Sequence, residues 1–293
     1  MNFAQRIKAR WRQYSLQERI VIPLVYVFLL VMAFKVLLPI FYVLMNSLKA
    51  VREFNDSAVA FPKTLEWANY ARAIVLEYRN TNVVGMFFNS IFYTVSYSVA
   101  NTFSSCMAAY ILSKYHFKAR GFIYSLAIAV QLIPVFGNAG ASFRLVSDLG
   151  LINHMSLMWI TALGGFDYTF LIVYSYFENV SWTYAEAAFI DGASNWYTFT
   201  RIMLPMVLPA ILTMWLSNVI ALWSDFSTPM IYLQDTPTLA SGLYNMKSRA
   251  PFVEGGITTY FAALIISIIP IVALYTVLQK QLLDVNVDGG IKG

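Results

Sequence analysis

Apolar residues along this chain form about six continuous stretches, and polar connections separate them. Each stretch of roughly 20 residues is long enough to cross a hydrocarbon core of about 30 Å as a helix. A transmembrane β-barrel would show short alternating segments instead, so continuous runs favour helices. The pattern therefore predicts an all-α membrane protein with six transmembrane helices. The predicted spans are 20–45, 86–112, 122–141, 155–177, 205–223 and 257–278.

The predicted spans divide the chain into five regions. Because the number of spans is even, both termini lie on the same side of the membrane. The apolar stretch after the basic N-terminus is longer than that of a cleaved signal peptide, so the first span is expected to be retained. The regions are an N-terminal arm (1–19), the first span (20–45), a polar segment outside the membrane (46–84), a core with five spans (85–283) that contains a loop at about 179–204, and a tail (284–293).

The composition supports lipid as part of the solvent and excludes several other classes of protein. Hydrophobic residues make up 59% of the chain and charged residues 12%, too few to cover a water-exposed globule. The net charge of +5 is what basic cytoplasmic loops produce, so it does not indicate nucleic-acid binding. Cys106 lies in an apolar run without a partner and is expected to be a buried packing residue. His116 and His154 fall on opposite predicted faces and cannot share a metal ion.

Basic residues indicate the orientation of the chain. Two connections contain them in excess: the N-terminal arm has Arg6, Lys8, Arg10, Arg12 and Arg19 against one acid, and the turn after the second span has Lys114, Lys118 and Arg120. Connections rich in Lys and Arg face the cytoplasm. The connections 46–84, 142–154 and 225–256 mix acids with bases, as expected of the outer face. Both termini and the loop at about 179–204 are therefore predicted to be cytoplasmic.

Two ionisable residues fall inside predicted spans, Lys35 in the first and Asp167 in the fourth. Charge within a membrane is costly unless it is paired or hydrated, so such residues are candidates for function. Lys35 could reach the interface or face a partner subunit. Asp167 follows Gly164 and Gly165, which allow a close helix approach or a bend. It either faces the transport path or makes a structural hydrogen bond between helices.

The loop at about 179–204 combines features of a helix, a break and a second short helix. Alanines at 185, 187 and 188 favour a helix with a slim surface, and Gly192 lets the backbone turn. Pro205 suits the first turn of the following span, where its missing N–H costs nothing. With Glu186 and Asp191, this slim helix in a cytoplasmic loop is typical of a segment that docks into a groove of another protein.

The spacing in this loop resembles that of the permease subunits of bacterial ATP-binding-cassette importers. Their "EAA loop" has Glu-Ala-Ala, three residues, Gly, nine residues and then Ile-x-Leu-Pro. The matching residues here are Glu186, Ala187, Ala188, Gly192, Ile202, Leu204 and Pro205. Asp191 and Ala193 flank the matching glycine. The full spacing in a predicted cytoplasmic loop is far more specific than three letters alone.

The resemblance implies a type I importer transmembrane fold in the bacterial inner membrane. It implies that residues 186–192 form a coupling helix in a cleft of a cytoplasmic ATPase, where Glu186 pairs with a basic residue. The partners implied are a second permease subunit, expected to be a different chain, two ATPase copies and an extracytoplasmic solute-binding protein. The sequence has no Gly-x-x-x-x-Gly-Lys-Ser/Thr motif. This chain is thus expected to be non-catalytic and to hold no cofactor, with ATP and Mg in the ATPase.

Further short matches favour the carbohydrate branch, similar to the smaller maltose-type permease. In family order they are Leu38-Pro39, Ser47-Leu48-Lys49, Asn89-Ser90, Asp191-Gly192-Ala193-Ser194, Trp223-Ser224-Asp225-Phe226 and Pro229. The cargo implied is a carbohydrate, and we favour an oligosaccharide. Gly289, Gly290 and Lys292 resemble a glycine-rich end that reaches into the ATPase dimer, although a frayed terminus is the alternative.

Two segments depart from the family pattern. The family usually has a proline and charged residues ahead of Glu-Ala-Ala, whereas Ser181, Trp182, Thr183 and Tyr184 precede it here. This departure puts the geometry at the start of the coupling helix in question. The outer segment 136–144 is richer in small residues than the family pattern, which indicates a particular sugar or binding-protein partner.

Candidate sugar contacts lie along the fifth span. Sugars are bound by aromatic faces together with amide and carboxyl groups, and Trp215, Asn218, Trp223 and Asp225 recur there at about helical spacing. With Asp167 they are the candidate substrate-path residues. Aromatic residues near span ends are also typical of interfacial anchors, and Trp223 fits that interpretation equally.

Three other interpretations remain open. The first is a permease of the same kind for another small polar solute, such as glycerol phosphate. The second is an ion-coupled secondary transporter, for which inverted repeats and broken helices are expected. No convincing repeat relates the two halves of the sequence, and such a transporter needs no docking loop. The third is a membrane-embedded enzyme.

Overall fold

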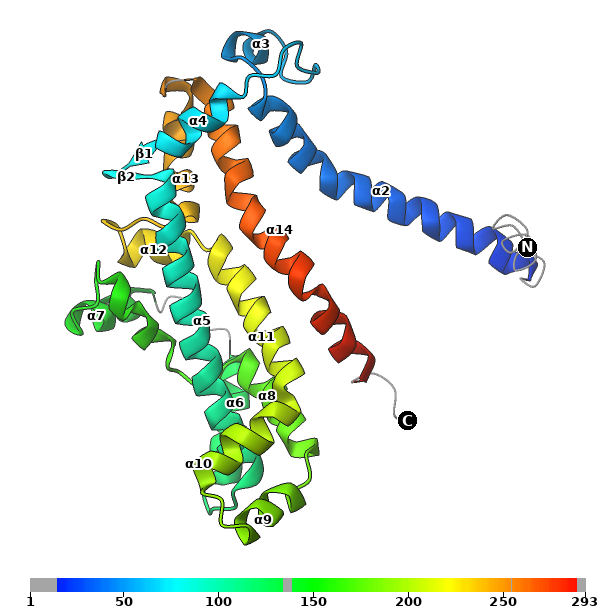
Figure 1. The fold of residues 1–293 in the computed structure, drawn as a ribbon, viewed down its shortest axis with the longest axis vertical. Coiled ribbons are helices and arrows are strands. Elements are labelled where there is room, and N and C mark those ends of the chain that lie inside the picture. Colours follow the sequence, from blue (N-terminus) through cyan, green and yellow to red (C-terminus); the bar gives the residue numbers. More distant parts are fainter. Residues whose placement is uncertain (1–14, 134–138, 254, 289–293) are drawn as a thin grey trace.

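The computed structural model describes residues 15–133, 139–253 and 255–288, and helices dominate it. Within these residues four helices are long and apolar enough to cross a membrane. They are α2 (Leu16–Ser47), α5 (Val83–Lys114), α11 (Leu204–Ser224) and α14 (Gly256–Asp288). They correspond to predicted spans one, two, five and six, and Figure 1 shows α5, α11 and α14 running along the length of the molecule.

Short elements gather at the two ends of these helices. The first end, called the α4 end below, holds α3 (Val51–Asp56), α4 (Ala68–Val75), β1 (Glu77–Tyr78), β2 (Thr81–Asn82), α12 (Ser227–Tyr232), α13 (Leu239–Met246) and the 3-10 helix η3 (Lys247–Phe252). The opposite end, the α9 end, holds α9 (Thr183–Ile190) and α10 (Asn195–Thr198) (Figure 1). β1 and β2 pair antiparallel as a small hairpin and are the two strands of the described chain.

The predicted third and fourth spans are not long single helices. The third region contains α6 (Arg120–Leu132), and α7 (Ala139–Asp148) is a separate helix. At about 1.5 Å per residue, the 13 residues of α6 extend only about 20 Å. The fourth region consists of the 3-10 helix η1 (Met155–Ala162), a break, and α8 (Tyr168–Asn179). The prediction of one continuous helix over 155–177 was therefore wrong, and the count of six long spans is not confirmed.

The break in the fourth region has two local causes. Gly165 adopts φ +71, a left-handed conformation that glycine tolerates, and its backbone lies close to the carbonyl oxygen of Ser104 on α5. Asp167 then caps α8, since its Oδ1 accepts the N–H of Phe170 at 3.0 Å. The sequence thus ends one helix and begins another within a stretch whose apolar residues alone suggest continuity.

The α5 helix is the centre of the packed bundle. It contacts α8, η1 and α11, and α11 contacts α14. The largest cluster of buried apolar residues lies where α5, α8 and the segment before α11 meet. In it the ring of Tyr110 lies 5.4 Å from that of Phe177 and 4.8 Å from that of Phe199, measured between centroids. Cys106 belongs to this cluster and is 2% exposed, which confirms the packing role expected of it.

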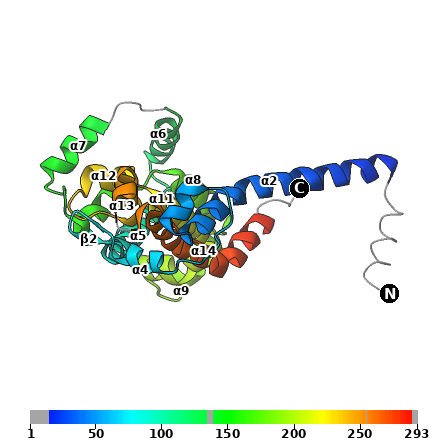
Figure 2. The same cartoon turned by 90° about the horizontal axis from the view of Figure 1, so that it is seen from above.

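The α2 helix projects away from this bundle. It contacts α14, and it leaves the other helices at an angle in both views (Figures 1 and 2). Apart from Ile22, the large apolar side chains along residues 20–41 are between 43% and 68% exposed. Its last turn is buried, because the Asn69 amide donates to the carbonyl oxygens of Ser47 and Lys49 at 2.9 and 2.8 Å. These contacts fix the end of α2 that lies at the α4 end.

The Lys49 side chain, just beyond this last turn, is fully buried, and its ammonium donates to the carbonyl oxygen of Ser57 at 3.0 Å. Desolvation lowers the pKa of Lys49 from its ordinary value, and the nearby Glu53 carboxylate partly opposes this. The buried lysine therefore ties the segment that follows α2 to the end of that helix.

Candidate coupling loop and transport path

The α9 helix has one face buried in the protein and one face open. Ala185 is 0% exposed and Ala188 is 6% exposed, and Ala185 packs in the same cluster as Phe177 and Phe199. The exposed residues from the start of α9 to the turn after it are Thr183, Tyr184, Glu186, Ala187, Ile190, Asp191 and Gly192, with Ile190 at 86%. The alanines therefore have two distinct roles. Ala185 and Ala188 allow α9 to lie close to the bundle, and Ala187 leaves the exposed face without a bulky side chain.

Aromatic rings hold the beginning of α9 against the bundle. The Trp182 ring lies 5.7 Å from that of Tyr115 and 6.0 Å from that of Phe189, measured between centroids. The Ser181 hydroxyl accepts the N–H of Thr183 at 3.3 Å. This Ser-Trp-Thr segment, where the family pattern has proline and charges, thus supplies its own contacts for starting the helix.

The end of α9 depends on Gly192. Its φ of +84 is left-handed, and an added Cβ would meet nothing within 4 Å, so the backbone conformation alone explains the glycine. The N–H of Ala193 donates to the carbonyl oxygen of Ala188 at 2.9 Å, which closes the helix. Ser194 then caps α10 by accepting the N–H of Tyr197 at 3.2 Å. The predicted order of helix, break and second short helix is confirmed.

Pro205 lies in the first turn of α11, as expected for the start of the following span. Helical structure also continues into α11 from Asn195, through the π-helix η2 (Phe199–Met203). A proline inside a helix removes one backbone hydrogen bond and crowds the preceding turn. The wider π turn directly before Leu204 and Pro205 is where such crowding can be relieved.

Contacts between the loop and α5 join the loop to the membrane helices. The Lys114 ammonium donates to the carbonyl oxygen of Val180, and the Tyr115 hydroxyl donates to the Asn195 side-chain oxygen at 3.1 Å. The two contacts flank α9, with Val180 before it and Asn195 after it. A displacement of α9 would therefore be transmitted to α5, while α10 leads through η2 directly into α11.

Two adjoining sets of hydrogen bonds, together called the polar network below, lie between α5, α6, α8 and α11. The Ser105 hydroxyl donates to Asp167 Oδ1 at 2.8 Å, and the Gln131 amide donates to the Asp167 carbonyl oxygen at 3.1 Å. The Asn218 amide donates to Asn101 Oδ1 at 3.0 Å and to Thr169 Oγ1 at 3.2 Å. Asp167 therefore makes the structural hydrogen bond that was one of its two predicted roles.

The candidate path residues consequently divide into two groups. Asp167 and Asn218 share the polar network, because Asn101 and Ser105 are one turn apart on α5 and Thr169 lies just after Asp167. Trp215 is on the same helix as Asn218, and its buried indole N–H meets no acceptor in the described residues.

Trp223 and Asp225 have other surroundings. The Trp223 N–H donates to the carbonyl oxygen of Ser267 on α14 at 3.0 Å, and its ring packs edge-on against Phe87 at 5.8 Å. Asp225 Oδ1 accepts the N–H groups of Ser227 and Thr228 at the start of α12. Both residues therefore join helices near the α4 end and do not belong to the polar network.

Sequence reasoning missed four members of the network: Asn101, Ser105, Gln131 and Thr169. The available signal was the pair Asn101 and Ser105, which lie at helical spacing in the second span, but other Asn, Ser and Thr residues of that span make it a weak one. Gln131 and Thr169 carry no comparable pattern. The tail residues Gly289, Gly290 and Lys292 lie outside the described residues, so their predicted ATPase contact stays a prediction.

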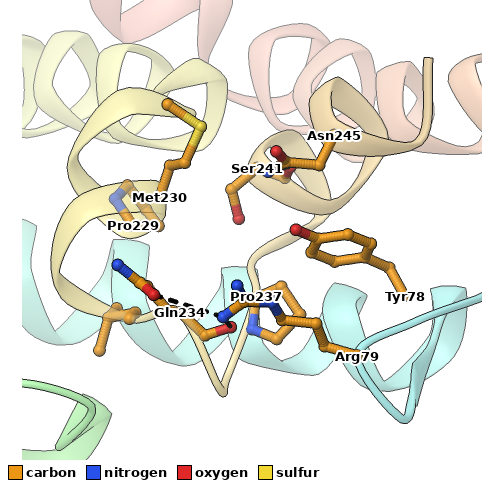
Figure 3. Close-up of a pocket in the computed structure, with 9 residues that line it drawn as sticks. Tyr78, Arg79, Pro229, Met230, Gln234, Pro237, Ser241 and Asn245 are labelled. Carbon is orange, nitrogen blue, oxygen red and sulfur yellow. Dashed lines mark hydrogen bonds between the residues drawn. The ribbon is translucent and has the colours of Figure 1, made fainter. Parts of the chain in front are cut away.

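A polar cavity of about 220 Å³ lies at the α4 end. Tyr78 and Arg79 from the β hairpin face Gln234, Ser241 and Asn245 across it (Figure 3). The Arg79 guanidinium donates to the carbonyl oxygen of Gln234 at 2.9 Å and to its Oε1 at 3.5 Å, and dashed lines mark the contact in Figure 3. It also lies 3.7 Å from the Asp235 carboxylate.

This cavity is bordered by unusual backbone. The non-glycine residues with left-handed φ among those described are Arg79, Asn80 and Asn153. Asn153 donates to the Asp235 carboxylate at 2.6 Å, and Arg79 reaches the same carboxylate, so Asp235 joins both left-handed segments. Left-handed non-glycine residues persist only where surrounding contacts hold them, and they cluster at functional sites.

The fold and the loop together define an integral membrane protein with a slim, exposed helix at one end of its helical bundle. Comparison with known proteins gives the family. Residues 100–284, more than half of the chain, match the model of the binding-protein-dependent transport system inner membrane component, and the chain belongs to this family. It is thus a multi-pass inner membrane permease subunit of a transport system.

Two relatives and one solved structure illustrate the similarity. The chain is 29% identical over 251 residues to the diacetylchitobiose uptake system permease protein NgcG of Streptomyces coelicolor, covering 84% of this chain and 81% of that one. It is 27% identical to the polygalacturonan/rhamnogalacturonan transport system permease protein YtcP of Bacillus subtilis, covering 95% and 100%. A bacterial ABC transporter that imports the acidic polysaccharide alginate matches with a TM-score of 0.75 and 26% identity, covering 91% and 98%.

Proposed function

We propose that this chain is one permease half of an ATP-driven importer for a carbohydrate, with an oligosaccharide as the favoured cargo. Membership of the permease family supports the importer, and the cargoes named for the relatives support the carbohydrate. The observation that carries the proposal is the division of α9 into a packed face and an open face at the Glu-Ala-Ala positions.

The open face of α9 is the surface that would contact the ATPase. It presents Tyr184, Glu186 and Ile190 without a bulky side chain at position 187. A cleft in the ATPase would accept the slim helix, and Glu186 would pair with a basic residue there. ATP and Mg would belong to that subunit, and this chain would be non-catalytic. Closure of two ATPase copies would displace α9 and, through α5 and α11, rock the permease between inward-open and outward-open states.

The location of α9 sets the orientation in this proposal. The α9 end would face the cytoplasm together with both chain termini, in agreement with the basic turn around Lys114 and Lys118. The α4 end would face outward, where the solute-binding protein would dock. The cavity beside Arg79 and its fixed backbone form a polar surface suited to that contact.

Asp167, Trp215 and Asn218 would lie along the substrate path. Asn218 and Asp167 offer amide and carboxylate groups for sugar hydroxyls, and the unpartnered indole N–H of Trp215 offers a donor. Trp223 and Asp225 are retained as weaker candidates near the α4 end. A second permease subunit, expected to be a different chain, would complete the path.

Affinity purification of the tagged chain from native membranes in mild detergent tests the proposal. An ATPase and a second permease should be recovered with it, and reconstituted vesicles should accumulate labelled oligosaccharide only with binding protein and ATP. Recovery of the chain alone, still transporting in response to an ion gradient without ATP, would contradict it. Accumulation of another solute but no oligosaccharide would contradict the carbohydrate assignment alone.

A further inference from the structure

Lys35 is a charged residue on the exposed surface of α2. The neighbouring apolar residues Phe34 and Val36 are each 68% exposed, and the Lys35 side chain is exposed as well. The described part of the chain offers Lys35 no ion-pair or hydrogen-bond partner. An ammonium group in hydrocarbon is costly without a compensating partner, so a group outside the described residues is needed to supply one.

The position of Lys35 along α2 places it well inside the bilayer. The apolar run covers residues 20–45, and a hydrocarbon core of about 30 Å centred on it has its midpoint near residue 32 or 33. At about 1.5 Å per residue, Lys35 is then only about 4 Å from the midpoint, toward the α4 end. Helical side chains tilt toward the helix N-terminus, so Lys35 leans back across the midpoint and away from its nearer interface. Snorkelling to lipid phosphates is therefore disfavoured.

The direction of Lys35 around the helix axis is given by Tyr42. These residues are seven positions apart, which places them on nearly the same side of an α-helix. The Tyr42 ring packs edge-on against Phe261 of α14, with centroids 6.1 Å apart. Lys35 therefore faces the α14 side of α2, within the wedge that opens between the two helices away from the α4 end (Figure 1).

Within the described residues, the apolar part of α14 that borders the wedge supplies no acid. The apolar part of α14, Gly256–Val277, contains no charged residue. Asp167 lies within the bundle and is held by Ser105 and by the N–H of Phe170. Acyl chains could fill the wedge but cannot neutralise the ammonium, and the phosphates of lipids lie at the interfaces.

We propose that a transmembrane helix of the second permease subunit occupies the wedge between α2 and α14 and presents a carboxylate to Lys35. This inference rests on the proposed function, since it requires that subunit. A buried ion pair of this kind fixes the register of two helices even where it adds little net stability. Apolar side chains along α2 would pack against the same helix, and the pair would select the correct partner and depth.

Photo-crosslinking in the intact complex tests the location. The photoreactive residue benzoylphenylalanine replaces Val31, one turn from Lys35 on the same side, so that the lysine itself is retained. Ala33, on the opposite side of α2, is the matched control position. The expected result is an adduct at position 31 with a second-permease peptide within one turn of an Asp or Glu, in at least fivefold higher yield than at position 33. Adducts with phospholipid alone would overturn the proposal.

Co-purification tests the charge. Lys35→Met should lower recovery of the second permease at least tenfold while membrane insertion is retained, because the variant helix is more apolar. Lys35→Arg should retain recovery. Lys35→Glu should lose the partner, and changing the crosslinked acid to Lys should restore it. Unchanged recovery with Lys35→Met would overturn the inference alone, whereas absence of both ATPase and second permease from the unaltered chain would overturn the proposed function as well.

Discussion

The coupling loop and the polar network around Asp167 are built in opposite ways. Within the loop, α9 begins with a contact from Ser181, ends at Gly192 and exposes Glu186, all within about a dozen residues. The network takes Ser105, Gln131, Asp167 and Asn218 from four different helices. A short segment can be identified from residue spacing, whereas a contact among distant helices requires the folded chain. The exposed face of the loop is therefore free to contact another protein, whereas the hydrogen bonds of the network hold helices of this chain together.

The largest effects are expected at Ala185 and Ala187, which lie on opposite faces of α9 and should respond differently to a larger side chain. Ala185→Leu inserts a larger side chain at a fully buried position and should destabilise the protein by about 1–3 kcal/mol. Ala187→Leu, on the exposed face, should change stability by less than about 0.5 kcal/mol but reduce ATP-driven uptake at least tenfold by obstructing docking. Thermal unfolding in detergent and uptake in vesicles measure the two effects. Equal stability loss in both variants would contradict the assigned faces of α9.

A smaller effect is expected in the network at Asp167. Asp167→Ala removes the cap of α8 and the acceptor for Ser105, and should cost about 1–2 kcal/mol of stability. Asp167→Asn should cost less, because the amide oxygen can still accept both hydrogen bonds. Thermal unfolding of the two variants gives the ranking. If Asn were as damaging as Ala, the negative charge rather than hydrogen bonding would be the important property.

The smallest effect expected is the coupling between Asn101 and Asn218. Single replacements by Ala and the double replacement form a thermodynamic cycle. Hydrogen bonds between membrane helices average about 0.6 kcal/mol, so a coupling of that size is expected from the 3.0 Å contact. Asn101 with Ser96, whose hydroxyl bonds only within its own helix, provides a control cycle with no coupling. If the coupling free energy were zero in both cycles, the hydrogen bond between Asn101 and Asn218 would make no contribution to stability.

The sequence predicted the long helices and the loop correctly, but not the break in the region 155–177. Four long spans and the helix–break–helix loop were predicted because apolar length and the Gly192 turn are local properties. The region 155–177 was predicted as one helix because apolar residues continue through it. Gly164 and Gly165 were expected to allow either a close helix approach or a bend, but only the structure shows that Asp167 caps a new helix there.

The transport-path residues show why spacing alone was insufficient. Trp215, Asn218, Trp223 and Asp225 follow one another along one stretch, yet they meet different neighbours once α5, α8 and α14 pack around α11. Asn218 contacts α5 and α8, whereas Trp223 bonds to α14. Helical spacing identifies residues that share a face but not the helix that covers that face.

The most direct test of the central claim is ATP-driven uptake by the complex with Glu186→Lys, beside Glu186→Gln as an isosteric control. Because Glu186 is exposed, neither change should reduce stability appreciably or alter sugar binding by the solute-binding protein. We expect Glu186→Lys to abolish uptake while ATP hydrolysis continues uncoupled, and Glu186→Gln to retain part of the transport. Uptake unchanged by Glu186→Lys would contradict coupling through α9.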